Sequence, residues 1–231
     1  MDALYVLPKM EIPTFITHYF ESDRGPFLNI CDLPDDELRR LVADEMDSET
    51  AFNRFALGPD FIEWRLVADD LLIRAYHDKF GFPPVGRPYF AVLGEFDKTL
   101  TMFRQGDRIV LNLSDFEDHE VTFMYPDHSH LTSLYGAEVP HLFYQLRDSP
   151  ENEGFRGQLF TFSELSSQFI DSGIADSIRS HLDRNGWAGC YVEAQIWCRD
   201  HRTRQGEQAV SCNLRQRPSL SSSSPPPVHS L

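Results

Sequence analysis

The sequence has no hydrophobic run of the roughly 18 residues that cross a membrane, and it is poor in basic residues. Its 21 lysines and arginines stand against 36 aspartates and glutamates, which gives a formal net charge of −15. Such a charge repels nucleic acid and anionic membranes. The first ten residues lack the basic cluster and apolar run of a secretory signal. We therefore predict a soluble, cytoplasmic protein with no nucleic-acid or membrane partner.

Cysteine is scarce, and its spacing excludes the common thiol motifs. The four cysteines, Cys31, Cys190, Cys198 and Cys212, form no C-x-x-C pair. Cys190 and Cys198 would lie too far apart along one strand to bond to each other. We expect reduced, buried thiols, as is usual in the cytosol.

Several catalytic motifs are also missing. The chain has no G-x-S-x-G, no G-x-x-x-x-G-K-[ST] and no G-x-G-x-x-G. This argues against an α/β-hydrolase, a P-loop NTPase, a protein kinase and a Rossmann dehydrogenase. Composition and motifs therefore name no reaction.

What is present indicates one α+β domain over residues 14–198. A chain of 231 residues that is 41% hydrophobic can bury one sizeable core. Alternation predicts strands at 14–20, 89–93, 108–113, 121–125, 157–162 and 191–197, and helical spacing predicts helices at 34–46, 60–80 and 163–184. Asp60 is the expected N-cap of the second helix and Gly81 its end. We expect a mixed or largely antiparallel sheet of five or six strands, flanked by three or four helices.

The remaining residues, 199–231, differ in composition. They hold five arginines against two acidic residues and include a run of four serines followed by three prolines. Such a segment cannot bury enough apolar area to fold, so we predict a disordered tail.

The 191–197 stretch is the best candidate for a functional site. One of its faces carries small apolar side chains, Val192, Ala194 and Ile196, which suit a core. The other carries a carboxylate and an amide between two aromatic rings, Tyr191, Glu193, Gln195 and Trp197. That composition suits the wall of a cleft. The solvent-exposed face of a sheet that carries two aromatic residues by chance would show the same pattern. We expect this to be the central strand, with Glu193 as the working carboxylate.

Two further side chains join this hypothesis. His18 lies in the middle of an apolar strand, where it is either a buried structural histidine or a catalytic base. If it faces one pocket with Glu193, the two form an acid–base pair. Tyr125, which ends the 121–125 strand, is added as a substrate-binding candidate.

A cluster of histidines follows Tyr125. His128, His130 and His141 are weak candidates for a metal site, because His-x-His places two imidazoles on one side of an extended segment. No zinc motif accompanies them, so we prefer a histidine-bearing loop and assign no metal.

Several blocks of sequence carry a resemblance, among them Thr-His-Tyr-Phe at 17–20, Tyr-Phe-Ala-Val-Leu-Gly at 89–94 and Tyr-Val-Glu-Ala-Gln-Ile-Trp at 191–197. In this order they resemble a family of short, uncharacterised bacterial and fungal proteins, a likeness that covers about residues 14–198 and implies no activity. The chain is also faintly similar to ADP-ribosyltransferase-like folds, which would imply roles for an early His18 and a late Glu193. Glu193-x-Gln195 reverses the Gln-x-Glu order of those folds, so no cofactor is assigned.

Two functional hypotheses follow. The first is a small-molecule enzyme or ligand-binding protein whose cleft is walled by Tyr191, Glu193, Gln195 and Trp197, with His18 nearby. The alternative is a non-catalytic interaction protein that uses an acidic surface, for example the acids of the 34–46 helix, Asp35, Asp36, Glu37, Asp44 and Glu45. The substrate, the reaction and the oligomeric state are not predicted.

Overall fold

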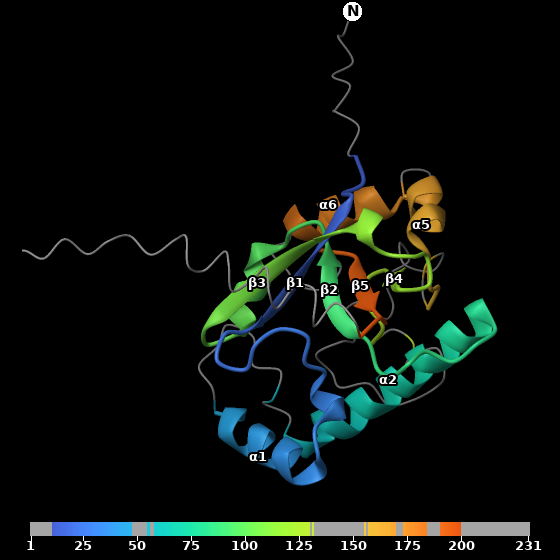
Figure 1. Ribbon diagram of the computed structural model, residues 1–231. Coiled ribbons are helices and arrows are strands. Elements are labelled where there is room, and N and C mark those ends of the chain that lie inside the picture. The colour runs from blue at the N-terminus through green and yellow to red at the C-terminus, as the bar shows by residue number, and fades with distance from the viewer. Residues whose placement is uncertain are drawn as a thin grey trace, which may run out of the picture. The chain divides into compact units, whose positions relative to one another are not determined.

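The computed structural model describes residues 11–47, 55, 58–129, 131, 155, 157–169, 173–183 and 190–199 (Figure 1). The chain divides into two units, Met1–Arg199 and Asp200–Leu231, and the fold below is that of the first. Apart from Arg199, the predicted disordered tail lies outside the described residues. None of the described helices is long and apolar enough to cross a bilayer.

Five antiparallel strands form the sheet, which confirms the predicted α+β class. Their order across the sheet is β3-β1-β2-β5-β4. In chain order the strands are β1 (Phe15–Glu21), β2 (Tyr89–Leu93), β3 (Gly106–Asn112), β4 (Val121–Met124) and β5 (Glu193–Ile196). The predicted central position of the 191–197 strand was wrong. β5 is an interior strand, but β2 occupies the centre.

Four α-helices are present in the described residues: α1 (Asp35–Glu45), α2 (Pro59–Phe80), α5 (Phe162–Gln168) and α6 (Ile174–Asp183). The N-cap of α2 is Gly58, not the predicted Asp60, which lies in the first turn after Pro59. Proline suits that first turn because its missing N–H would be unbonded there. Gly81 ends α2 as predicted, in the left-handed conformation at φ 78°.

The strand predicted at 157–162 is reduced to a single bridge, and the helix predicted from residue 163 begins at Phe162. Phe160 pairs with Phe123 as an isolated bridge. Thr161 then caps α5: its side chain accepts a hydrogen bond from the N–H of Glu164, whose carboxylate accepts one from the N–H of Thr161. This reciprocal capping box fixes the start of α5 at Phe162, one residue before the predicted helix start at 163.

The two faces of the sheet are covered differently, as Figure 1 shows with α5 and α6 on one side and α1 and α2 on the other. The face towards α5 and α6 is apolar, and its core includes Ile16, Ala91, Phe123, Leu165, Ile174, Ala194 and Ile196. The opposite face packs against α2 through Met124 and Trp197. α1 packs on the first half of α2 through Leu38, Leu41 and Trp64. α2 therefore closes the face to which Glu193 belongs.

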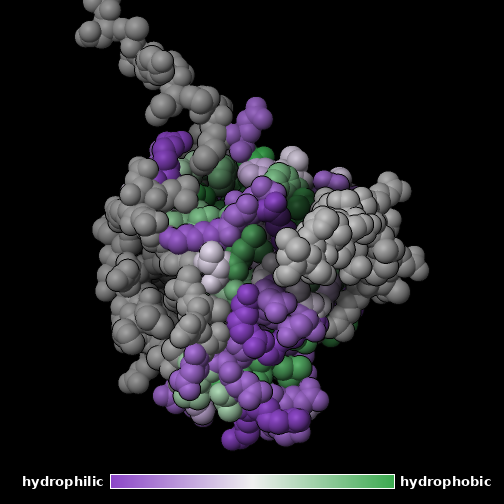
Figure 2. Space-filling view, turned by 90° about the vertical axis from the view of Figure 1, so that its left-hand side faces the viewer, coloured by the Kyte–Doolittle hydropathy of each residue, from purple (hydrophilic) through white to green (hydrophobic). Residues whose placement is uncertain are grey.

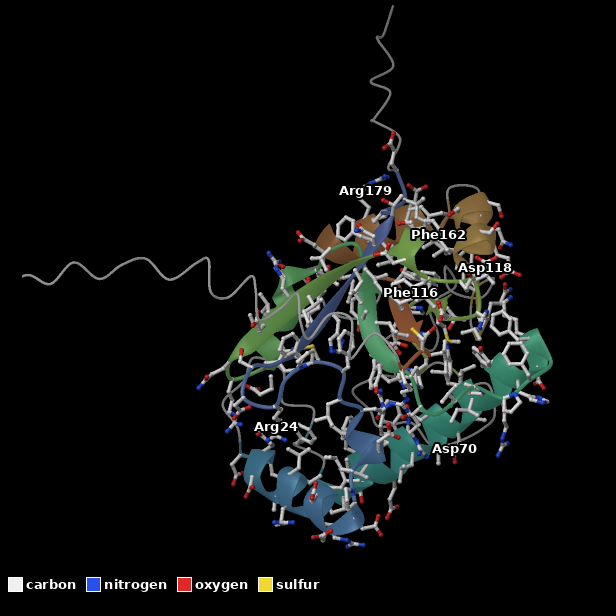
Figure 3. All side chains as sticks on the ribbon, in the orientation of Figure 1. Arg24, Asp70, Phe116, Asp118, Phe162 and Arg179 are labelled. Carbon is white, nitrogen blue, oxygen red and sulfur yellow. The ribbon has the colours of Figure 1, made fainter. Side chains whose placement is uncertain are left out.

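One acid of α1 departs from the expected acidic surface. Glu45 is buried and lies 2.9 Å from the Arg24 guanidinium and 3.0 Å from that of Arg104. Arg24 is labelled in Figure 3, between the sheet and α1. On the side shown in Figure 2, hydrophilic side chains are spread over much of the described surface. Glu45 is thus an internal ion-pair partner rather than a surface acid.

Candidate functional site

His18 is buried, and both of its ring nitrogens are used by the backbone. The N–H of Phe27 donates to Nε2 at 2.8 Å, so Nε2 carries a lone pair. Nδ1 must then hold the proton and donates it to the Phe90 carbonyl at 2.7 Å. Burial lowers the pKa of His18 to about 4, which keeps the ring neutral at pH 7. Neither nitrogen is left over for proton transfer.

His18 and Glu193 do not face one pocket, contrary to the predicted pair. β2 lies between their strands. In an antiparallel sheet, paired residues point to the same face, and Glu193 pairs with Val92, which pairs with Thr17. Glu193 therefore lies on the same face of the sheet as Thr17. His18 follows Thr17 in β1, and successive side chains alternate, so His18 points to the other face.

Tyr125 also lies away from Glu193. It is fully buried in the core on the α5 and α6 side, and its hydroxyl is 2.7 Å from the Ser177 hydroxyl. A ring enclosed in this way is part of the packing. The predicted contact of Tyr125 with a substrate does not fit this position.

The polar side chains of β5, together with Trp197 just after it, form a chain of hydrogen bonds in which every bond is donated towards Glu193. The indole N–H of Trp197 can only donate, and it donates to the Thr122 hydroxyl at 2.8 Å. That hydroxyl then gives its single proton to Oε1 of Gln195 at 3.0 Å. The amide of Gln195 is thereby oriented to donate through Nε2 to Glu193 Oε1 at 2.8 Å. The chain of donors ends at Glu193, which must accept.

His128, in the segment after β4, is the partner of Glu193. Its Nδ1 lies 2.8 Å and 3.0 Å from the two carboxylate oxygens, and its backbone N–H donates to Oε1 at 3.1 Å. The imidazole also stacks on Phe90 of β2, with ring centroids 4.7 Å apart. The His128 backbone N–H and the Gln195 amide both donate to Glu193, so an ionised carboxylate, which only accepts, is the form that fits.

A second carboxylate, Asp69 of α2, lies on the other side of the imidazole. Asp69 is completely buried, and its Oδ1 is 3.5 Å from His128 Nε2 and 3.1 Å from Arg65 Nε. Its Oδ2 accepts a hydrogen bond from the Asn29 amide at 3.2 Å and lies 3.7 Å from Arg87 Nε. His128 therefore links α2 to β5, because its ring lies between Asp69 of α2 and Glu193 of β5.

The charges of this cluster support one another. Burial by itself lowers the pKa of His128, but the contacts with the Glu193 and Asp69 carboxylates together outweigh it and raise the pKa to about 9. Burial by itself raises the pKa of Asp69, but Arg65 and His128 lower it to about 2. At pH 7 the site thus holds two cations, Arg65 and His128, beside two carboxylates.

The ion pairs nevertheless leave polar atoms without aligned hydrogen bonds. Arg65 Nε, Asp69 Oδ1 and His128 Nε2 are all buried and have no hydrogen-bond partner of acceptable geometry among the described residues. Distances of 3.1 and 3.5 Å supply attraction between charges, but the N–H groups are not directed at the oxygen. Buried polar atoms are nearly always satisfied, so these three stand out as the unsatisfied hydrogen-bonding groups of the cluster.

The remaining predicted residues differ in their access to solvent. Gln195 and Trp197 are buried, at 0% and 3% exposed, and Trp197 packs on Tyr76. Tyr191 is partly exposed and its ring lies 5.5 Å from that of Phe96. Burial and the charges of Asp127 and Glu193 raise the pKa of Tyr191, so its phenol keeps its proton. Of the predicted wall, Tyr191 is the residue nearest to solvent.

The predicted histidine cluster is only partly described. His130 and His141 lie outside the described residues, and His128 is engaged by Glu193. Within the part of the chain that the structure describes, no group of three or more His, Cys, Asp or Glu side chains is arranged to hold a metal ion. Within the described residues, Cys31, Cys190 and Cys198 form no disulfide.

Asp69 and Arg65 were missed by the sequence-based prediction, although a signal was present. Both lie on the stripe of α2 that otherwise carries apolar side chains: Arg65 follows Phe61 by four positions, and Asp69 precedes Leu72 by three. A charge that interrupts an apolar stripe needs a buried partner. Their partner, His128, lies far away in the sequence.

No family model matches this chain, and no match was found among curated proteins or solved structures. The resemblance to short bacterial and fungal proteins stays a prediction.

Proposed function

We propose that this chain is a small-molecule enzyme or ligand-binding protein whose working groups are Glu193 and His128. The observation that supports the proposal most directly is the contact between the Glu193 carboxylate and the His128 imidazole. Glu193 contacts Nδ1 of His128, and Nε2, on the other side of the imidazole, has no aligned hydrogen-bond partner within the described ranges of the chain. A histidine fixed by a carboxylate through one nitrogen has the other nitrogen available for a proton transfer or a ligand.

The charge of His128 defines what it would do. Although burial lowers it, Glu193 raises the pKa of His128 to about 9, so the ring is an imidazolium at neutral pH. An imidazolium gives a proton or a hydrogen bond rather than taking one. We therefore assign His128 the role of general acid or hydrogen-bond donor, and Glu193 that of a positioning residue that holds the imidazolium.

The surroundings of the pair suit a small ligand. Arg65 lies over the Phe90 ring at 4.2 Å and adds a second cation beside His128. Phe90 and Tyr191 are partly exposed, whereas Asp69 is fully buried. A ligand that reached the pair from the side of Phe90 and Tyr191 would meet aromatic rings first and charges behind them, as in many small-molecule sites.

The acidic-surface alternative has no comparable support in the described residues. Of the five acids of α1, Glu45 is buried against Arg24 and Arg104. Asp36 pairs with Arg40 of its own helix at 3.0 Å.

The test compares ligand binding by the wild-type protein with that by Glu193→Gln. Saturation-transfer NMR with a mixed library of sugars, nucleosides, carboxylic acids and amines gives the hits, and titration gives their affinities. We expect Glu193→Gln to weaken binding of the true ligand at least about 10-fold, because the neutral amide no longer holds His128 as a cation.

Glu45→Gln is the matched control. It removes a second buried glutamate that is paired with arginines, at another place in the fold. Its binding should equal that of the wild type, even though its free energy of unfolding falls. A ligand that binds all three proteins equally would mean that Glu193 and His128 do not form the binding site.

A further inference from the structure

Three buried polar atoms beside the proposed site converge without satisfying one another. They are Arg65 Nε, Asp69 Oδ1 and His128 Nε2, and none has an aligned hydrogen-bond partner in the part of the chain that the structure describes. Asp69 Oδ1 lies 3.1 Å from the arginine nitrogen and 3.5 Å from the histidine nitrogen. Each of these two separations is short enough for one added oxygen to lie about 2.8 Å from both atoms.

The three atoms define the chemistry of the group that would complete them. Arg65 Nε–H is a donor, and His128 Nε2–H is a donor in the charged ring. Asp69 Oδ1 is an acceptor. The matching group accepts two hydrogen bonds and donates one, which is the capacity of a hydroxyl oxygen.

Other common groups match less well. A phosphate or carboxylate oxygen would accept from both donors but would bring a negative charge against Asp69. A carbonyl oxygen would leave Asp69 Oδ1 without a donor, and an ammonium would leave both N–H donors without an acceptor. The pattern of two donors and one acceptor therefore selects a neutral oxygen that carries a proton.

We propose that Arg65, Asp69 and His128 bind one hydroxyl oxygen, either an alcohol of a small polyhydroxylated ligand or an ordered water. The inference rests on the proposed function, because it names the chemistry that the same site would recognise. Water and a sugar alcohol present the same oxygen. Buried waters usually have two to four polar partners, and this site offers three.

The exposures of the three residues show from which side such an oxygen would enter. The side chain of Arg65 is 17% exposed, that of His128 2% and that of Asp69 0%. Approach therefore runs past Arg65 towards Asp69. The partly exposed pair of Tyr191 and Phe96 offers aromatic faces against which the CH groups of a sugar ring could pack.

A crystal structure at about 1.2 Å resolution, prepared without glycerol and then soaked with D-ribose, tests the inference directly. We expect a single oxygen within about 3.2 Å of all three atoms. A water before the soak that is replaced by a ribose hydroxyl identifies an alcohol ligand. The same water before and after the soak identifies water as the natural occupant. An empty site with an aligned, shortened contact between Nε2 and Oδ1 overturns the inference.

Solution NMR on the full chain provides an independent measurement. The Nε2 proton of His128 should show a cross-relaxation peak with the bound water, and D-ribose should reduce that peak saturably if it displaces the water. Arg65→Met, which removes one donor, should abolish the peak. Arg74→Met, an exposed arginine on the same helix, should leave it unchanged. A peak that survives Arg65→Met overturns the site.

Failure of this inference is distinguishable from failure of the proposed function. If the crystal site is empty while Glu193→Gln still loses binding of a library ligand, the Glu193–His128 pair remains the site and only its hydroxyl recognition is wrong. If an oxygen is present but no ligand depends on Glu193, the triangle holds a structural water and the proposed function fails.

Discussion

Two histidines lie almost equally deep on opposite faces of one sheet, yet they carry opposite charge states. His18 is 4% exposed and His128 is 2% exposed. Burial lowers the pKa of His18 to about 4, whereas the pKa of His128 is raised to about 9 by Glu193 and Asp69 against the effect of burial. The partners, and not the depth of the ring, decide whether a buried imidazole is charged.

The same difference separates the two faces of the sheet. On the α5 and α6 side, His18 bonds only to backbone groups and stacks on Phe27 with ring centroids 4.8 Å apart. On the α2 side, His128 is one member of a buried ionic layer. Buried charges are costly unless they are paired, so a layer of this kind is tolerated where geometry is exact or function requires it. This contrast is the reason for assigning function to His128 and structure to His18.

The largest effect is expected from Asp69→Ala, which would break the ionic layer at its most buried member. The change leaves Arg65, Arg87 and His128 without their shared carboxylate. Removing one partner of a buried ion pair costs about 3–5 kcal/mol, so the free energy of unfolding should fall by that amount. Urea denaturation followed by circular dichroism measures it.

Asp70→Ala is the matched control, because Asp70 is the next residue of α2 and pairs with Arg87 at the surface. Exposed pairs contribute about 0–1 kcal/mol, and the control should lose no more. Equal losses in the two variants would contradict the buried layer.

The second prediction concerns pH, where the two histidines should act in opposite directions. His128 has a raised pKa, so its contribution to stability is complete below about pH 6.5 and is lost as the pH rises through about 9. His18 has a lowered pKa, so its contribution is present above about pH 6.5 and is lost as the pH falls through about 4. Each contributes on the order of 3 kcal/mol over its window.

NMR titration of the imidazole resonances separates these two contributions from those of the carboxylates. One buried histidine should titrate well above the ordinary value of about 6.5 and the other well below it. If both buried histidines titrate on the same side of that value, the predicted difference in charge between His18 and His128 is wrong.

The fold was largely predictable because local rules act within single elements. The alternation of Phe15 to Phe20 and the apolar spacing of α2 identify both elements correctly, as does Gly81 at the helix end. The misplaced strand at 157–162 shows where these rules conflict. There alternation predicts a strand that runs to residue 162, whereas Phe160 pairs only as a single bridge and the capping box of Thr161 and Glu164 starts α5 at Phe162.

The site was only half predictable, because its members meet through the sheet topology. The polar face of β5 follows from alternation and correctly indicated that Glu193 and Gln195 share one side. Whether His18 or His128 shares that side depends on which strands pair and in which register, and no local pattern carries this information. Asp69 was visible only as a charge on an apolar stripe.

The third prediction removes the neutral histidine. His18→Leu leaves the Phe27 N–H and the Phe90 carbonyl without their side-chain partner, at a cost of about 1–3 kcal/mol. Because His18 is neutral at pH 7, the loss should be the same at pH 7 and about pH 9. It should shrink only as the pH falls towards about 4. A loss that grows with alkaline pH would mean that His18 is charged, and denaturation at several pH values decides this.

The smallest expected effect comes from Trp197→Phe, which keeps an aromatic ring against Tyr76 but removes the donor that starts the hydrogen-bond chain of β5. Without that N–H, the Thr122 hydroxyl is free to turn, and Gln195 is no longer held as a donor to Glu193. We expect a loss of about 1 kcal/mol in stability. The pKa of His128 should also shift, because the carboxylate that faces it loses a fixed partner.

His18 is the internal control for this change, since it lies on the opposite face and shares none of these bonds. In one NMR titration of the variant, the resonances of His128 should move and those of His18 should not. A shift of both histidines would point to a general loosening of the sheet. An unchanged His128 would show that the orientation of Gln195 does not control the charge of the Glu193–His128 pair.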